Sequence, residues 1–165
     1  MNSSTNAVSR GPRVRRQPSL PESMRRVSPP FDYVDVFTAT TDAAALASPE
    51  RWARAGVEDA AGSAGQFVWR RILALRLDGR PSPERIGGWT IADRGDDWIR
   101  LEARSWCLTA HILVQAGRTE LTIATFIRYD RPPASLVWPR LAVAHRRAMP
   151  GLMRRAVRSV TGSSR

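Results

Sequence analysis

The chain has 165 residues, which suits one domain of ordinary size rather than two. Its formal net charge is +11, and all 26 basic residues are arginine, because the sequence contains no lysine. The lack of lysine excludes Schiff-base chemistry and a phosphate-binding P-loop. A single cysteine, Cys107, excludes a disulfide framework and a cysteine zinc cluster built from this chain.

The positive charge is concentrated at the two ends of the sequence. Residues 1–30 carry a net charge of +5 and residues 140–165 a net charge of +7, whereas residues 31–139 carry −1. The chain is therefore a near-neutral body with two basic ends, and its net charge alone does not indicate nucleic-acid binding.

Residues 1–30 are predicted to be a disordered basic tail, and residues 31–165 a single domain. Prolines and polar residues interrupt any helical or strand period in the tail. A transit peptide and an anion-binding arm are alternatives to a solvated tail, and Met24 is an alternative start of translation. The tail lacks the apolar core of a secretory signal, and no apolar run is long enough to span a membrane. A cytoplasmic location is therefore expected, with peripheral contact with the membrane left open by the basic ends.

The first half of the domain predicts one strand followed by two helices. Residues 33–40 are β-branched and aromatic and predict a strand. Ser48 and Pro49 form a helix start, so a helix is expected over 49–59. A second helix is expected over 65–77, where Phe67, Ile72 and Leu75 fall towards one side.

A period of two then predicts antiparallel strands. The strands are expected over 88–93, 98–105, 109–115 and 120–129, with turns at 94–97 and 116–118 and a bend near 106–108. From residue 134 the period returns to 3.6 and predicts one long helix to near the end. The order of elements indicates an α+β fold in which the sheet packs against the final helix.

This order and several motifs resemble the helix-grip fold of the START/SRPBCC superfamily, which includes polyketide cyclases. The segments that carry the resemblance are residues 101–106, 124–126, Trp138, His145-Arg146 and 150–155. They are most similar to a bacterial family of unknown function whose members are sometimes appended to short-chain epimerase-like proteins. The resemblance implies a curved antiparallel sheet wrapped around a long C-terminal helix, with two short helices after the first strand and an apolar cavity inside.

His145 is the candidate catalytic residue. It lies in the middle of the apolar face of the final helix, between Leu141 and Leu152, and would point into such a cavity. The alternative is a buried histidine that only contributes to packing. No carboxylate or cysteine stands at ligand spacing from His111 or His145, so neither a metal nor another cofactor is expected.

Three functions remain open from the sequence. The first is binding of a small apolar or lipid-like molecule, the second a cyclase or dehydratase that uses His145 as general acid or base, and the third a basic protein that contacts an anionic surface. An anionic membrane surface is a candidate partner, whereas nucleic acid is disfavoured because no binding motif accompanies the arginines. The predicted ligand-binding residues are Trp89, Trp106, His111, Phe126, Trp138, Leu141 and Leu152, and the predicted anion contacts are Arg140, Arg147, Arg154 and Arg158.

Overall fold

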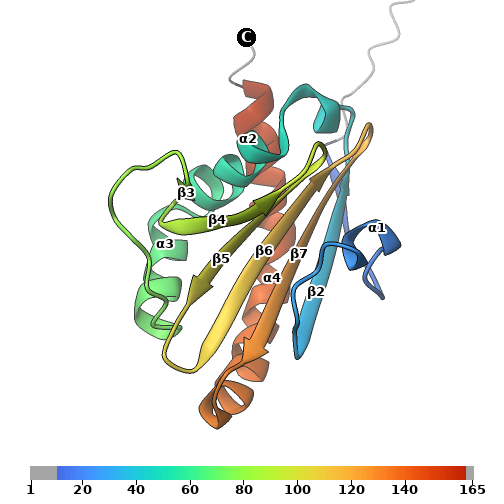
Figure 1. Ribbon diagram of the computed structural model, residues 1–165. Helices are drawn as coiled ribbons and strands as arrows, with labels where there is room; N and C mark the ends of the chain where they lie inside the picture. Colours follow the sequence, from blue (N-terminus) through green and yellow to red (C-terminus); the bar gives the residue numbers. More distant parts are fainter. Residues whose placement is uncertain (1–10, 163–165) are drawn as a thin grey trace, which may run out of the picture.

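Seven antiparallel strands form one open, curved sheet in the computed structural model, which describes residues 11–162 (Figure 1). Their order across the sheet is β1-β2-β7-β6-β5-β4-β3, so β2 and β7 pair although they are far apart in the sequence. The strands are β1 (Arg13–Arg16), β2 (Tyr33–Thr40), β3 (Arg85–Ile86), β4 (Trp89–Arg94), β5 (Trp98–Arg104), β6 (Leu108–Ala116) and β7 (Glu120–Tyr129).

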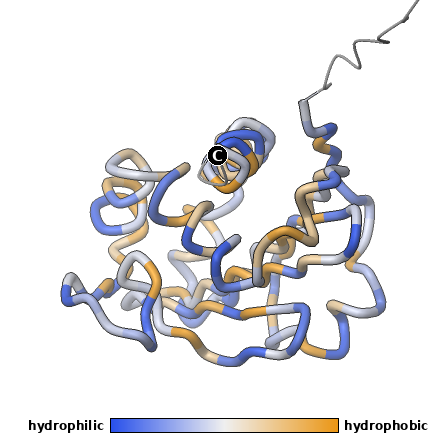
Figure 2. The backbone as a smooth tube through the Cα atoms, turned by 90° about the horizontal axis from the view of Figure 1, so that it is seen from above, coloured by the Kyte–Doolittle hydropathy of each residue, from blue (hydrophilic) through white to orange (hydrophobic). Residues whose placement is uncertain are grey.

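Most of the helices lie on one side of this sheet, as the view turned by 90° shows (Figure 2). The Ser48 hydroxyl accepts a hydrogen bond from the Arg51 amide, and Pro49 opens the helix that follows, as the sequence predicts. The helical segments are α1 (Glu22–Arg25), η1 (Asp42–Leu46), α2 (Pro49–Arg54), η2 (Ala55–Ala60), α3 (Gly62–Phe67), η3 (Val68–Ile72) and α4 (Pro132–Gly162).

The helix α4 runs along the concave face of the sheet and confirms the long C-terminal helix. Pro139 and Pro150 lie inside it. Its buried side is formed by Trp138, Ala142, Met149, Met153, Ala156, Val157 and Val160, which pack against side chains of the sheet and of the helical run α2 to η3. The fold is therefore α+β, with a seven-stranded antiparallel sheet and a long helix across it.

The other face of the sheet carries a second, smaller apolar cluster. Met24 of α1 is fully buried there, against Leu113 and Phe126 of the central strands. The sheet is thus covered on both faces near its middle. This explains why every residue from Leu121 to Ile127 is buried, regardless of which way its side chain points.

The prediction of a disordered tail over 1–30 is wrong for residues 11–30. Arg13 to Arg16 form the edge strand β1, which pairs with β2, and α1 supplies the buried Met24. Both features depend on contacts with distant strands, so the local proline content misled the prediction. Residues 1–10 lie outside the described residues.

The predicted helix over 65–77 ends early. Helical structure stops at Ile72, Ala74 has a positive φ of 50°, and residues 74–79 form no helix or strand, with Leu73, Leu75 and Leu77 buried at alternate positions. The amide of Arg76 donates to the carbonyl oxygen of Arg104, so this segment runs along the end of β5. Phe67 and Ile72, predicted to lie on one side of this helix together with Leu75, are exposed, whereas Leu75 is buried.

The strands of the second half match the prediction to within a residue or two, including the turn between β5 and β6 near residues 106–108. Within residues 11–162, no helix has the length and apolar character needed to cross a bilayer.

Candidate functional site

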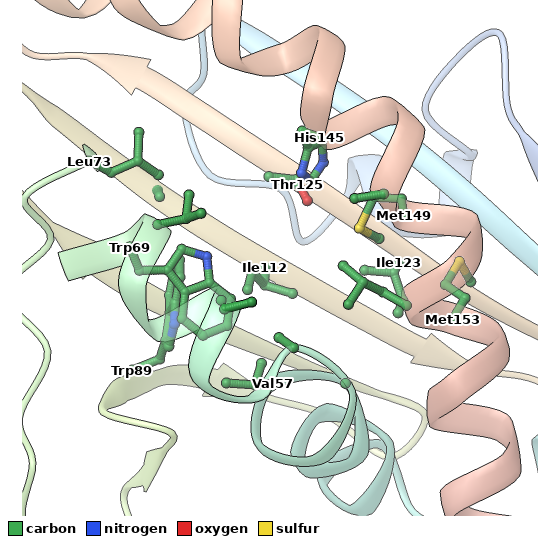
Figure 3. A pocket seen from close by; sticks show the side chains of 18 of the residues that line it. Val57, Trp69, Leu73, Trp89, Ile112, Ile123, Thr125, His145, Met149 and Met153 are labelled. Atoms are coloured by element: carbon green, nitrogen blue, oxygen red, sulfur yellow. The ribbon is translucent and has the colours of Figure 1, made fainter. Parts of the chain in front are cut away.

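A cavity of about 400 Å³ lies between the concave face of the sheet and the helices that cover it (Figure 3). Its floor consists of alternate residues of the two central strands, such as Ile112 of β6 and its cross-strand partner Thr125 of β7. Its walls come from the α2 to η3 run on one side and from α4 on the other. The lining is almost entirely apolar, which suits a ligand that is itself mostly apolar.

His145 brings a polar group to this apolar wall. It projects from α4 towards Thr125, and both side chains line the cavity (Figure 3). The Nε2 atom of His145 is enclosed and has no hydrogen-bond partner among residues 11–162. Burial lowers the pKa of this histidine from its usual 6.5 to about 4, so the imidazole is neutral at pH 7.

Aromatic rings hold the imidazole on two sides. The indole of Trp138 lies 5.7 Å from it and the ring of Phe37 lies 6.4 Å from it, measured between ring centroids. The indole nitrogen of Trp138 is also buried without a partner in the described part of the chain. Because an unpaired buried polar atom costs free energy, these two side chains are polar positions that a ligand could satisfy, and the buried indole nitrogen of Trp89 also lacks a partner among the described residues.

A buried carboxylate lies on the same face of the sheet, outside the cavity lining. Asp35 of β2 accepts a hydrogen bond from Nε of Arg16 of β1 at 2.8 Å and another from the hydroxyl of Tyr33, and Nη2 of Arg16 lies 2.7 Å from the carboxylate. Arg146 of α4 donates to the same hydroxyl at 3.3 Å. Burial and the neighbouring Asp35 raise the pKa of Tyr33 well above its usual value, so the tyrosine remains a hydrogen-bond donor. This chain of polar groups ties β1, β2 and α4 together beside His145.

A two-residue turn places Trp89 in the wall opposite α4. Gly87 and Gly88 join β3 to β4 with positive φ angles of 56° and 90°, which residues other than glycine rarely adopt. Trp89 follows directly and packs edge-on against Trp69, with 5.4 Å between ring centroids. The two glycines therefore make the tight turn that precedes Trp89.

Five predicted site residues therefore meet in one place. Trp89, Trp138, Leu141, His145 and Leu152 all line the cavity.

His111 and Phe126 do not line the cavity, because both side chains point to the opposite face of the sheet. They are cross-strand partners, and their neighbours in the chain, Ile112 and Thr125, take the cavity positions. The Nδ1 atom of His111 lies 3.8 Å from Oε2 of Glu102, and burial lowers the pKa of His111 to about 4. Phe126 packs against Phe31 and Met24. Since successive side chains alternate between faces, a strand buried on both sides gives no local sign of which face holds a cavity.

Trp106 does not belong to the cavity either. It lies in the turn between β5 and β6 and is 52% exposed, because the strand pattern ends at Arg104. The predicted anion contacts Arg140, Arg147, Arg154 and Arg158 are all exposed along α4, as expected from the helical wheel.

Several cavity residues were not identified from the sequence. The helical period of α4 points to Met149 and Met153 as part of its inner face, yet nothing local marks them as cavity residues rather than core. Nothing in the local sequence marks Thr125, because it becomes a cavity residue only through its position opposite His145 of α4. The missed lining residues include Trp52, Val57, Trp69, Ile112, Thr125, Met149 and Met153.

The described residues contain no group of histidine, cysteine and acidic side chains that could hold a metal ion. Comparisons with protein-family models, with curated proteins and with solved structures found no match to this chain.

Proposed function

We propose that this protein binds a small apolar or lipid-like molecule in the cavity between the sheet and α4. The observation that carries the proposal is the cavity itself, about 400 Å³ in volume and lined almost wholly by apolar side chains. Empty apolar space of this size costs stability, and it falls within the range of known ligand pockets. The proposal includes membership of the START/SRPBCC superfamily, with α4 as the gripped helix.

The polar positions define the kind of ligand. Thr125 and the neutral His145 can exchange hydrogen bonds with a hydroxyl or carbonyl group, but they offer no charge to a carboxylate. The preferred ligand is therefore a molecule with an apolar body and one uncharged polar group next to these two residues.

The test uses the neutral fluorescent probe N-phenyl-1-naphthylamine together with native mass spectrometry of the freshly purified protein. Replacing Ala110, a buried floor residue on β6, by phenylalanine fills part of the cavity. Ala110→Phe should weaken probe binding by about tenfold or more. The matched control, Ala92→Phe, makes the same chemical change at an exposed position of β4 and should leave binding unchanged.

Probe binding that is absent from the native chain, or equal in the two variants, would contradict the proposal. If the cavity is merely a packing defect, Ala110→Phe should instead raise the melting temperature while no ligand co-purifies and no probe binds.

A second candidate function is a cyclase or dehydratase reaction in the same cavity. The unpartnered Nε2 of the neutral His145 favours it, because a neutral imidazole can accept a proton from a bound substrate. In this case His145→Ala should reduce turnover of a poly-β-ketone thioester by about a hundredfold or more, while the circular dichroism spectrum stays native. Equal turnover by the variant would leave binding as the function.

A further inference from the structure

The cavity opens to solvent between two helical segments. On the α3 and η3 side, the exposed lining residues are Ala64, Val68 and Ile72, spaced four residues apart. On the α4 side they are Ala144, Ala148 and Arg155. The mouth of the cavity therefore lies between these two rows of side chains.

Large apolar side chains stand exposed at this mouth. Phe67 at the end of α3 is 61% exposed, and Val68 and Ile72 of the adjoining η3 are 37% and 45% exposed. Single exposed apolar residues are common on protein surfaces, but a cluster at the entrance of an apolar cavity marks a surface that meets another apolar phase.

The charge around the mouth has one sign. Residues 62–72 and 132–162 together contain eight arginines and no acidic residue. On α4, Arg147 follows Ala144 by three residues and Arg154 precedes Arg155, so both border the row that lines the mouth.

Several arginines at the mouth also lack an ion-pair partner in the described part of the chain. Arg71, Arg147, Arg154 and Arg155 form no ion pair with any residue in the range 11–162. Several arginines away from the mouth pair with carboxylates, whereas Arg13, Arg76, Arg80, Arg118 and Arg131 have no ion pair among the described residues. The pairs include Arg15 with Glu120, Arg51 with Asp59, Arg54 with Glu50 and Glu58, Arg85 with Asp78, Arg94 with Glu84, Arg104 with Glu102, and Arg128 with Asp130.

We propose that this mouth face, defined as Phe67, Val68, Arg71, Ile72, Arg147 and Arg154, docks on an anionic lipid bilayer. The arginines contact lipid phosphates, while Phe67 and its apolar neighbours enter the boundary between headgroups and acyl chains. Nucleic acid would meet the same arginines but offers no apolar phase for Phe67 and Ile72. Docking in this orientation turns the open side of the cavity towards the lipid, so that an apolar ligand enters without crossing water.

The experiment measures co-sedimentation of the full chain with vesicles. Equal mixtures of dioleoylphosphatidylglycerol and dioleoylphosphatidylcholine should bind the protein about tenfold or more tightly than pure phosphatidylcholine, and binding should weaken as salt rises. Random-sequence duplex DNA at the same phosphate concentration is the comparison for the other class of polyanion.

Two variants test the two parts of the face, each with a matched control. Arg147→Glu combined with Arg154→Glu should reduce vesicle binding by about tenfold or more, whereas Arg13→Glu combined with Arg118→Glu makes the same change in net charge on the sheet and should have a much smaller effect. Phe67→Ser should also reduce binding, whereas Phe31→Ser on the opposite face of the sheet should not.

Equal losses for both arginine pairs would mean that only net charge matters and would overturn the proposal. It would also be overturned by vesicle binding that ignores Phe67→Ser, or by equally tight binding to DNA. Failure here is separable from failure of the proposed function, because Phe67, Arg147 and Arg154 do not line the cavity. Binding of N-phenyl-1-naphthylamine in vesicle-free solution should remain native in these variants.

Discussion

The imidazole of His145 lies 5.7 Å from the indole of Trp138, centroid to centroid, with 53° between the ring planes. Each ring has an enclosed nitrogen that lacks a partner among residues 11–162. Two unpaired polar atoms therefore lie side by side on an apolar wall, where burial disfavours the charged form of the imidazole. This arrangement determines how the stability of the protein responds to pH.

Acidification from pH 7 to about pH 5 should destabilise the protein through His145. Its folded-state pKa of about 4 lies below the usual 6.5, so the unfolded chain binds more protons between these values. Stability from this group is complete above about pH 6.5 and is lost as the pH falls towards 4. Urea unfolding should show a loss of about 1–2 kcal/mol from this residue between pH 7 and pH 5.

The variant His145→Leu should lose this part of the pH dependence and should be more stable than the native chain at pH 5. His111→Leu serves as the comparison, because burial depresses the pKa of His111 to about 4 on the other face of the sheet. Each single variant should remove about half of the combined effect. An unchanged pH dependence in His145→Leu would show that its imidazole is already protonated or solvated in the folded state.

The ion pair between Arg16 and Asp35 should contribute to stability. Asp35 is fully buried and Arg16 is half exposed, so Arg16→Gln leaves a buried carboxylate without its cation. We expect the free energy of unfolding to fall by about 1–3 kcal/mol, less than for a fully buried pair. Arg13→Gln is the control on the same strand and should change stability by less than about 0.5 kcal/mol.

A chain that begins at Met24 tests the same edge of the sheet. It lacks β1 and Arg16, so the edge of β2 and the carboxylate of Asp35 both lose their partners. This shortened protein should be less stable than Arg16→Gln and more prone to aggregate through its open edge. If both proteins unfold at the same urea concentration, β1 contributes no stability beyond the ion pair of Arg16 with Asp35.

Gly88→Ala should destabilise the turn that places Trp89. A Cβ atom at this position would lie 2.8 Å from the carbonyl oxygen of Asp78, and the φ angle of 90° disfavours alanine. A loss of about 2 kcal/mol or more is expected, with a shift in tryptophan emission as Trp89 moves. Gly79→Ala, where no atom lies within 4 Å, should retain the native stability and emission.

Met24→Ala should cost about 2–4 kcal/mol, because Met24 is fully buried in the cluster on the face of the sheet away from α4. The control is Leu46→Ala, a truncation of a side chain that is 67% exposed. Equal melting temperatures for Met24→Ala and the native chain would mean that α1 does not cover the sheet in solution.

Much of the fold could be predicted because its signals are local. The strict alternation and turn residues between Trp98 and Tyr129 predict the central hairpins, and the 3.6 period after residue 134 predicts α4 with its buried and arginine-bearing sides. Ser48 and Pro49 likewise mark a helix start from sequence alone. These elements follow from the geometry of strands and helices, which requires no knowledge of distant contacts.

The candidate site could be predicted only in part. The position of His145 on the inner side of α4 follows from the helical period, and Trp89, Trp138, Leu141 and Leu152 join it in the cavity. On the sheet, Phe126 and His111 face away from the cavity, while Thr125 and Ile112 line it. Because both faces of these strands are buried, hydrophobicity does not tell one face from the other.

By itself, the sequence determined the elements of the second half, the absence of lysine chemistry and the basic side of the last helix. The tertiary structure decided which strand residues line a cavity, where that cavity opens, and that residues 11–30 belong to the domain through Arg16 and Met24. The physical reason is the same in each case. Segments far away in the chain decide which face of a strand is buried and which residue pairs with a buried charge. Helical and strand periods, in contrast, depend only on neighbouring residues.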